Sequence, residues 1–370
     1  MKVPFFDYKA FAAELPFTSF VQESLDSGFL IGGPKVSEFE EALQSFTGIK
    51  HVISVANATD ALEIIFEYLN LPRGSKVLVP AHTMIATASA VDRCGLEVVP
   101  IDVDPISLVV TSYQLSQINL SEISAFVCTQ LNGICSDMDA ILRILDDHNI
   151  ILIEDSADGI GSFHKNSHAG SFGIAGCLSF YPAKVLGCLG DGGAILTNSD
   201  DMNAFARSVR DHGRGPDLLP IHWGRNSRLD SIQANILLHK LPYLNDYIET
   251  RRDIARLYDS KLSDLEETGF IKKPVSTSFK SNDLSTYQNY EIRAVNRDQL
   301  QSFLTDKGIG TIRQWGGFSI PHMSHLGFDI SNYPETENLF NQLLLLPMNH
   351  LMSLEQAEFV CDHVNQFYSV

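Results

Sequence analysis

The chain has the sequence ILIEDSADGIG at residues 151–161, where an apolar run ends in two acids and then in small residues. An apolar run of this length without polar alternation is typical of a strand buried on both faces, as in a parallel sheet. Asp155 and Ser156 are also common helix N-caps, so these residues either begin a helix or serve a site. Ligands of open parallel sheets bind beyond the carboxyl ends of the strands. The segment therefore predicts a buried strand whose end is a candidate site.

Similar short apolar runs occur on both sides of this segment. Helix-length segments with apolar residues at helical spacing, Thr59–Leu69 and Met138–His148, lie between some of them. Strands alternating with helices predict an α/β layered domain with a mainly parallel sheet. The expected strands are His51–Val55, Lys76–Val79, Glu97–Ile101, Ala125–Thr129, Ile150–Ile153, Gly176–Phe180 and Ala194–Thr197.

The pattern changes at Ser231, after which apolar residues follow a helical period as far as Leu257. Pro242 is expected to kink or split this helix. We therefore expect a large domain at residues 1–242 and a small C-terminal α/β domain at residues 243–370, with the N-terminal segment a candidate to pack on the small domain. The elements expected in the small domain are a strand at Tyr287–Val295, a helix at Arg297–Lys307, a loop at Gly308–Gly317 and a helix at Leu354–Tyr368.

Composition excludes several classes of protein. The 370 residues include 27 Lys and Arg and 45 Asp and Glu, a net charge of −18, which argues against binding nucleic acid or an anionic membrane surface. No apolar run is long enough to span a membrane, and the N-terminus does not resemble a signal peptide. The six cysteines lack CxxC spacing, so no metal site is expected and a reduced, cytoplasmic protein is favoured.

A lysine and a glycine-rich loop form the second candidate motif. Residues 178–184 are LSFYPAK, and residues 187–193 are GCLGDGG. A single lysine is usually solvated, but the turn before Lys184 and the four glycines after it favour close approach of the backbone to a ligand. The glycines match neither the dinucleotide-binding nor the P-loop pattern.

The third motif, VANATDAL at residues 55–62, leads from a strand into a helix. Such a helix start is either an ordinary capped N-terminus or a phosphate site, because its N–H groups and dipole attract anions. A lysine that can form a Schiff base, an aspartate that can pair with a pyridinium nitrogen and a helix start that can hold a phosphate are together what pyridoxal phosphate requires.

The ordered set of motifs resembles the DegT/DnrJ/EryC1/StrS family of pyridoxal-phosphate-dependent nucleotide-sugar aminotransferases. The resemblance covers nearly the whole chain and implies the fold-type I transferase fold, with a large, mainly parallel sheet domain and a small α/β domain. The segments that carry it are Gly33–Glu40, Ala58–Leu62, Val79–Thr87, Asp137–Ile141, Glu154–Gly161, Ser179–Gly193, Asp211–Gly215, Asn226–Asp230 and Leu346–Met348.

The resemblance implies roles for individual residues. Lys184 would bond covalently to the cofactor and move protons, and Asp155 would pair with the pyridine nitrogen. The other implied cofactor contacts are stacking on the ring by His82, phosphate binding by Ala58, Thr59 and Ser179, and contact with the phosphate of a neighbouring subunit by Asn226. The residues implied to lie near the sugar nucleotide, or to make its pocket positive, are His212, Arg214, Arg228 and Arg313. Asn226 would thus make the active site shared within a homodimer.

Ordinary structural roles compete with three of these assignments. His82 is alternatively a packed core histidine, Asn226 a helix cap, and Ser179 a residue that satisfies nearby backbone. Asp158 departs from the family, which mostly has Gln or His at a position that contacts the cofactor's 3′-oxygen. Asp158 is therefore expected to stay protonated, to act through water or to point elsewhere.

An aspartate at this position also resembles the sugar 3-dehydratases of the family, which have histidine in place of the lysine. Because Lys184 is present, transamination is favoured. Two further segments that depart from the family pattern, Thr129–Gly133 and Gly310–Gly317, are expected to influence substrate choice.

The resemblance implies amino transfer from L-glutamate to a nucleotide-activated keto-deoxysugar, with a 4-keto-6-deoxyhexose preferred and C3 or C4 as the acceptor carbon. The product would serve aminosugar, surface polysaccharide, lipopolysaccharide or O-antigen biosynthesis. Two alternatives stay open: a pyridoxal-phosphate-dependent keto-sugar dehydratase, and a non-catalytic member with a regulatory or scaffold role.

Overall fold

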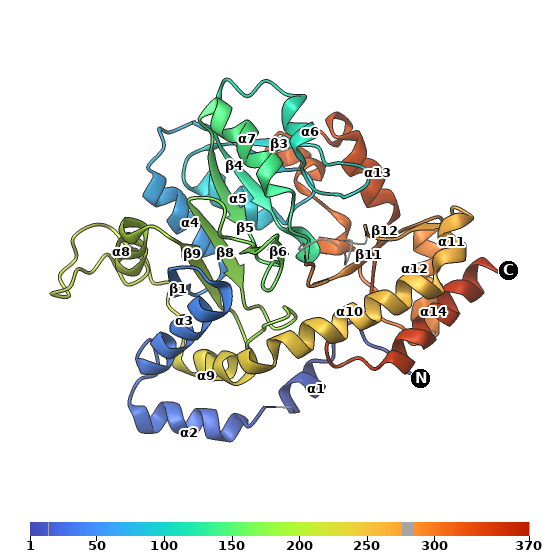
Figure 1. Cartoon of the computed structure of the whole chain (residues 1–370), viewed down its shortest axis with the longest axis horizontal. Helices are drawn as coiled ribbons and strands as arrows, with labels where there is room; N and C mark the ends of the chain where they lie inside the picture. Colours follow the sequence, from blue (N-terminus) through green and yellow to red (C-terminus); the bar gives the residue numbers. More distant parts are fainter. Residues whose placement is uncertain (14, 276–283, 370) are drawn as a thin grey trace.

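The computed structural model describes residues 1–13, 15–275 and 284–369. Its core is a seven-stranded sheet with the order β1-β9-β8-β5-β4-β2-β3 (Figure 1). Neighbouring strands are parallel except at β9, which runs antiparallel to both β1 and β8. The predicted α/β class with a mainly parallel sheet is thereby confirmed. The strands of this sheet are β1 His51–Val55, β2 Lys76–Pro80, β3 Glu97–Ile101, β4 Ile123–Thr129, β5 Ile151–Asp155, β8 Ala175–Ser179 and β9 Gly193–Thr197.

Seven of the predicted strands correspond to these seven, with ends that differ by at most two residues. Their apolar runs were visible because both faces of the sheet are covered. Within β2, for example, Val77 and Val79 pack into one hydrophobic cluster whereas Leu78 packs into another on the opposite face. A hairpin of two-residue strands, β6 Phe163–His164 and β7 Ser167–His168, was not predicted because two residues show no period.

Helices cover both faces of the large sheet. One face packs against α4 Ala58–Leu69, α5 Ile85–Arg93 and α8 Asp200–Val209. The other face packs against α3 Pro34–Thr47 and α9 Ser231–Lys240 at the β1 end and against α7 Met138–His148 toward β4, with α6 Ser112–Ser116 beside α7. This arrangement leaves the carboxyl ends of the parallel strands open for a site.

Pro242 lies in a 3₁₀ turn, Leu241–Tyr243, which separates α9 from the long helix α10 Leu244–Lys261. The predicted split of the helix therefore occurs at the proline, which lacks an N–H to continue the helical hydrogen bonds. Helix α10 supplies Ile248 to the core beside the large sheet and Tyr258 to a second core. A single rigid helix thus contacts both cores, and the proposed boundary at residue 242 stays a prediction.

The second core surrounds a three-stranded antiparallel sheet with the order β10-β11-β12. Strand β11 is shorter than predicted, because Tyr287 has a left-handed backbone with a φ of 48°. The helices α12 and α14 were predicted, whereas β10, β12 and α13 were not. The elements are α11 Ser263–Glu267, β10 Ile271–Lys272, β11 Tyr290–Ala294, α12 Arg297–Asp306, α13 Pro334–Gln342, β12 Leu343–Leu346 and α14 Leu354–Tyr368.

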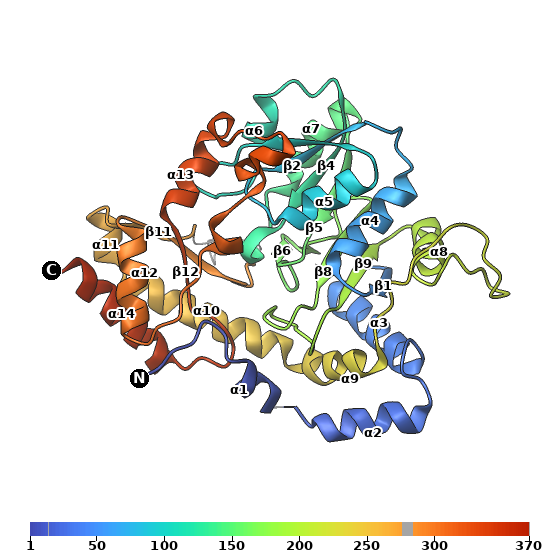
Figure 2. The ribbon, with the colours of Figure 1, turned by 180° about the vertical axis from the view of Figure 1, so that it is seen from behind.

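The N-terminal segment runs beside both cores. Val3 pairs with Ile309 and is buried in the small core. Helices α1 Tyr8–Ala13 and α2 Phe17–Ser27 then follow α10 and α9 toward α3 (Figure 2). Among the described helices, none has the length and apolar character that crossing a membrane requires.

Candidate active site

A cavity of about 360 Å³ lies at the carboxyl ends of β4, β5 and β8, between the large sheet and the small one. We call its lining residues from Asn57 to Asp191 the floor, because they follow the strands of the large sheet. We call the others the wall: Phe5, Phe6, Gln288, Asn289, Ile312, Gln314, Trp315, Leu345 and Met348. The predicted site residues that line the cavity all belong to the floor, and they are Ala58, Thr59, Asp155, Asp158, Ser179 and Lys184.

Asp155 is the last residue of β5 and is buried. Its Oδ2 accepts a hydrogen bond of 2.6 Å from the Thr87 hydroxyl, and its Oδ1 accepts one of 3.2 Å from the Ala157 N–H. The segment after Asp155 forms turns and then β6, so the helix N-cap interpretation is wrong. The carboxylate is held rigidly where a ligand in the cavity can meet it.

Lys184 lies in the turn that follows β8, and its side chain is 21% exposed. Its ammonium group donates a hydrogen bond to Oδ1 of Asp158. The turn closes tightly, because a Cβ on Gly187 would lie only 2.3 Å from the carbonyl oxygen of Pro182. Gln288 fixes the turn from the other side, since its side chain accepts from the Val185 N–H at 2.9 Å and donates to the Ala183 carbonyl at 3.0 Å.

Asp158 faces Lys184 directly in this structure, and its role toward the cofactor stays a prediction. Its second oxygen, Oδ2, accepts a 3.1 Å hydrogen bond from the N–H of Asn132. Arg251 is buried nearby, and burial lowers the pKa of its guanidinium to about 10 while the charge of Asp158 acts in the opposite direction. The carboxylate therefore serves as the ionic partner of the lysine.

The start of α4 forms the anion-binding part of the floor. Asn57 caps the helix, and its side chain accepts from the Asp60 N–H at 2.8 Å. Ala58 and Thr59 belong to the first turn, whose N–H groups have no partner within the helix and can bind a phosphate. Gly193 lets β9 begin against this turn, because a Cβ there would lie 2.5 Å from the carbonyl carbon of Asn57.

Ser179 ends β8 beside this turn, and its hydroxyl accepts a 3.3 Å bond from the Tyr181 N–H. It therefore satisfies local backbone and lines the cavity at the same time.

His82 is not among the residues that line the cavity. Its side chain is buried, Nδ1 donates to the Leu108 carbonyl at 3.0 Å, and the ring contacts Trp315 and Phe340. Burial lowers the pKa of His82 to about 4, so the ring is neutral at physiological pH. The described chain thus places His82 as a packed histidine, and Met84, two residues further on, lines the cavity instead.

The remaining predicted residues lie outside the cavity of this chain. Asn226 accepts a 3.1 Å bond from Arg228, which also pairs with Asp211 at 2.9 Å. Arg214 lies in the same loop and pairs with Asp211 at 3.3 Å, and His212 is an exposed residue beside it.

Arg313 pairs with Asp298 at 3.2 Å and Gln301 at 3.0 Å. Among the lining residues Lys184 is the only lysine or arginine, beside three aspartates, so the expected positive pocket is not formed by one chain.

Sequence reasoning did not find the wall. Its carboxamides, Gln288, Asn289 and Gln314, and its aromatic residues come from segments far apart in the chain. Thr87, which donates to Asp155, was also not singled out, although it lies in the motif Val79–Thr87. The departing segments Thr129–Gly133 and Gly310–Gly317 were the available signal, because each supplies lining residues.

The residues present fit pyridoxal phosphate. An amine, a buried carboxylate and a helix start with spare N–H groups face one cavity at the ends of β5, β8 and β1. They match the aldehyde, the ring nitrogen and the phosphate of that cofactor. Fold and site together define the class: a pyridoxal-phosphate-dependent aminotransferase of fold type I.

The chain belongs to the DegT/DnrJ/EryC1/StrS aminotransferase family, whose model matches residues 15–365. It is 33% identical to the UDP-2-acetamido-2-deoxy-3-oxo-D-glucuronate aminotransferase of Pseudomonas aeruginosa, over 92% of this chain and 93% of that protein. It is 32% identical to the dTDP-3-amino-3,4,6-trideoxy-alpha-D-glucose transaminase of Micromonospora megalomicea, over 94% and 93%. These relatives are nucleotide-sugar aminotransferases.

Solved structures show the same fold. A DegT/DnrJ/EryC1/StrS aminotransferase from Brucella abortus superimposes with a TM-score of 0.90 at 32% identity, covering 99% of both chains. NtdA from Bacillus subtilis, solved with bound pyridoxamine phosphate (PMP), has a TM-score of 0.86 at 25% identity and covers 99% of this chain and 85% of that one. Pyridoxal phosphate is therefore the cofactor of this chain.

Proposed function

We propose that the protein transfers an amino group from L-glutamate to the keto carbon, C3 or C4, of a nucleotide-activated deoxysugar, with a 4-keto-6-deoxyhexose as the preferred acceptor. The observation that carries the proposal is the pairing of Lys184 with Asp158 in a cavity that also exposes Asp155 and the start of α4. The cofactor, when bound, supplies an aldehyde that accepts the amine and a ring that withdraws electrons from the reacting carbon.

The floor residues supply the remaining functions. Lys184 is the lining group that can hold and move a proton at its Nζ atom, and Asp158 orients that atom. Asp155, fixed by Thr87, would keep the ring nitrogen of the bound cofactor protonated. The first-turn N–H groups of Ala58 and Thr59, together with the Ser179 hydroxyl, bind the phosphate.

The test is a panel of nucleotide-linked 3-keto and 4-keto sugars incubated with purified protein, cofactor and L-glutamate. Mass spectrometry and NMR would identify the product, its nucleotide and its aminated carbon. Stoichiometric amine incorporation is expected with at least one 4-keto-6-deoxy sugar. A deoxygenated product without amine transfer would instead establish the dehydratase alternative, which the aspartate at position 158 prompted.

We also propose that two copies of the chain share each active site. The loop after α8 supports this proposal, because it projects from the body of the molecule (Figure 1) and carries Trp223 with 98% of its surface exposed. The same loop region carries Asn226, Arg214 and Arg228. A second copy could therefore supply arginines for the phosphate-bearing ligands to a cavity in which Lys184 is the only lining lysine or arginine of one chain.

A mixing experiment tests this sharing. Asn226→Ala and Lys184→Ala proteins would each be inactive or weak, and subunit exchange would create mixed dimers with one intact site. Random exchange of an equal mixture makes half of the dimers mixed, and each mixed dimer has one intact site of two, so about a quarter of the wild-type activity is expected. No recovery despite demonstrated exchange would exclude a shared site.

The biological role forms the last part of the proposal. An aminosugar nucleotide is a precursor for surface polysaccharide, including lipopolysaccharide and O-antigen. A cytoplasmic location is supported by buried cysteines such as Cys128 and Cys177, which fit a reducing compartment.

A further inference from the structure

Asn132 occupies an unusual position between the floor and the wall. It lies in the 3₁₀ turn Leu131–Gly133 with a left-handed backbone, φ 56°. That backbone directs its N–H to Asp158, the partner of Lys184. Its side chain contacts Glu291 in β11, Asn289 just before β11, and Gln314 in the segment after α12. One residue thus touches both halves of the cavity.

The Asn132 side chain fixes two carboxamides of the wall. Its Oδ1 accepts from Asn289 Nδ2 at 2.8 Å and from Gln314 Nε2 at 3.0 Å. Both carboxamides line the cavity. Because each amide nitrogen is committed to Asn132, the orientation of each carboxamide is set and each nitrogen has one further N–H. Asn289 also keeps its acceptor oxygen, whereas the Gln314 oxygen is buried without a partner.

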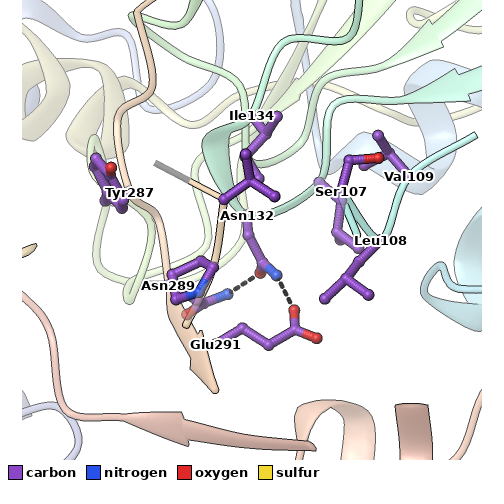
Figure 3. Close-up of a pocket in the computed structure, with 11 residues that line it drawn as sticks. Ser107, Leu108, Val109, Asn132, Ile134, Tyr287, Asn289 and Glu291 are labelled. Atoms are coloured by element: carbon purple, nitrogen blue, oxygen red, sulfur yellow. Dashed lines mark hydrogen bonds between the residues drawn. The ribbon is translucent and has the colours of Figure 1, made fainter. Parts of the chain in front are cut away.

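Glu291 fixes Asn132 in turn. Asn132 Nδ2 donates to Glu291 Oε2, and Figure 3 shows the Asn132 side chain between those of Asn289 and Glu291. The oxygen and nitrogen ends of a carboxamide have nearly the same shape, so hydrogen bonds decide which end faces which way. The bond to Glu291 directs the Asn132 nitrogen toward Glu291 and therefore the Asn132 oxygen toward Asn289 and Gln314. Without Glu291, the two wall carboxamides would lose their assigned orientation.

Glu291 is surrounded by few charges. Burial raises its pKa to about 8, although Arg293 on the same strand acts in the opposite direction. The other titratable group that faces it in the described chain is His82, whose Nε2 lies 4.0 Å from Glu291 Oε1. Since His82 Nδ1 donates to Leu108, its Nε2 is an acceptor that faces the buried Glu291 Oε1 at a distance too long for a hydrogen bond.

Resting on the proposed function, we propose that Asn289 and Gln314 are specificity-determining residues that read the polar ring substituents, hydroxyl or acylamino, of the sugar acceptor. Asn132 is the positioning residue that presents them, and Glu291 holds Asn132. This assignment concerns acceptor choice, so the glutamate half-reaction serves as its internal control.

The test compares Asn132→Gly with the wild type in the two half-reactions. Glycine adopts φ 56° without strain and keeps the N–H to Asp158, so only the side-chain contacts are lost. The KM for the ketosugar should rise at least about tenfold, as expected for the loss of a site's hydrogen-bonding groups. The visible absorbance of the bound cofactor and the rate of the glutamate half-reaction should change less than about threefold. Asn289→Ala is the second variant, and it should raise the same KM. It keeps the inference testable in the event that Asn132→Gly does not fold.

The outcomes are distinguishable. Wild-type protein that aminates no sugar would defeat the proposed function, not this inference. An active wild type with an unchanged acceptor KM in Asn132→Gly and Asn289→Ala would defeat the inference. Equal losses in both half-reactions together with loss of cofactor binding would also defeat it, because they would indicate a merely structural role.

Glu291→Gln supplies two readouts, the acceptor KM and the free energy of unfolding, and the second does not depend on activity. Gln keeps an acceptor for Asn132 and a donor toward His82, so the acceptor KM should stay within about threefold, whereas Glu291→Ala should raise it like Asn132→Gly.

The folded-state pKa of Glu291 lies above its unfolded value, so the free energy of unfolding of the wild type should fall, relative to Glu291→Gln, as pH rises from about 4.5 to about 8. Parallel pH profiles of the two proteins would contradict a protonated Glu291.

Discussion

The floor and the wall of the cavity differ in chemistry. The floor contains Lys184 and three aspartates, all of them close to the ends of strands in the large sheet. The wall contains no Asp, Glu, Lys, Arg or His among its lining residues, and consists of carboxamides, aromatic rings and aliphatic side chains. The charged groups, together with the helix start proposed to bind phosphate, thus lie on one side, and neutral groups that contact a substrate by shape and hydrogen bonds lie on the other.

The supports behind the two surfaces differ in the same way. Strand β1, which leads into Asn57, is held by the buried carboxylate of Glu40, which pairs with Arg207 at 2.8 Å and with Arg210 at 2.6 Å. The wall is held by Glu291, for which burial favours the neutral acid. Changes to the floor should therefore affect the chemical step, and changes to the wall should affect the choice and affinity of the acceptor.

The largest effect is expected for Lys184→Ala. Loss of the only lysine or arginine that lines the cavity removes the group that moves protons, so amine transfer should fall at least about 10³-fold. Product formation followed by mass spectrometry would measure this loss, and circular dichroism would verify that the variant folds. Residual activity above a few per cent would show that the floor does not carry the chemistry.

Asp155→Asn should have the next largest effect. The amide can keep the bond from Thr87 or Ala157 but cannot stabilise a positive charge in the cavity, so kcat should fall about 10²-fold. Both half-reactions should slow, since the floor serves both. Thr87→Val is the matched control: it removes only the hydroxyl that orients the carboxylate and should lower kcat less. A change in the acceptor KM alone would contradict the division between floor and wall.

The floor could be predicted from sequence because its residues directly follow apolar runs. Asp155, Ser179 and the turn at Ala58 each lie where a strand ends, and the local pattern shows this position. The pattern did not show which residue of the segment after β2 faces the cavity. Met84 lines it, whereas His82 turns into the core beside Trp315.

The wall could not be predicted because three distant segments build it. Phe5 and Phe6, Asn289, and the stretch from Ile312 to Met348 meet only after the small sheet and the N-terminal segment have packed. No local period indicates such a meeting. Asn226 and Arg228 lie outside the cavity of this chain, and only under the proposed sharing would they face the cavity of a second copy, which no pattern within one chain can indicate.

A moderate effect is expected at the wall for Phe6→Ala. The Phe6 ring packs edge-on against Tyr8, with a centroid distance of 4.9 Å, and closes one side of the cavity. Its loss should cost about 1 kcal/mol of acceptor binding, which raises the KM for the nucleotide sugar about fivefold. Steady-state kinetics with varied acceptor would measure it, with Phe6→Leu as the control that keeps apolar area. An equal slowing of the glutamate half-reaction would show that the wall also serves the donor.

The smallest effect on catalysis, and a separate effect on stability, is expected for Glu40→Gln. Burial alone would raise the pKa of Glu40, but the charges of Arg210 and Arg207 and their hydrogen bonds outweigh it and lower the pKa. The substitution leaves two arginines without their buried partner, so the free energy of unfolding at pH 7 should fall by about 3 kcal/mol. Since Glu40 does not line the cavity, kcat should stay within about twofold once the protein is folded.

The pH dependence of this loss gives the sharpest contrast between the two supports. The folded-state pKa of Glu40 lies below the unfolded value, so its stabilising contribution is present at neutral pH and is lost as pH falls below about 4.5. The difference in unfolding free energy between wild type and Glu40→Gln should therefore shrink on acidification. For Glu291 the corresponding difference should change between pH 4.5 and 8 and with the opposite sign. Denaturant titrations of both pairs from about pH 2.5 to about pH 9 would measure the two trends, and trends of the same sign would show that the floor and the wall do not rest on differently charged supports.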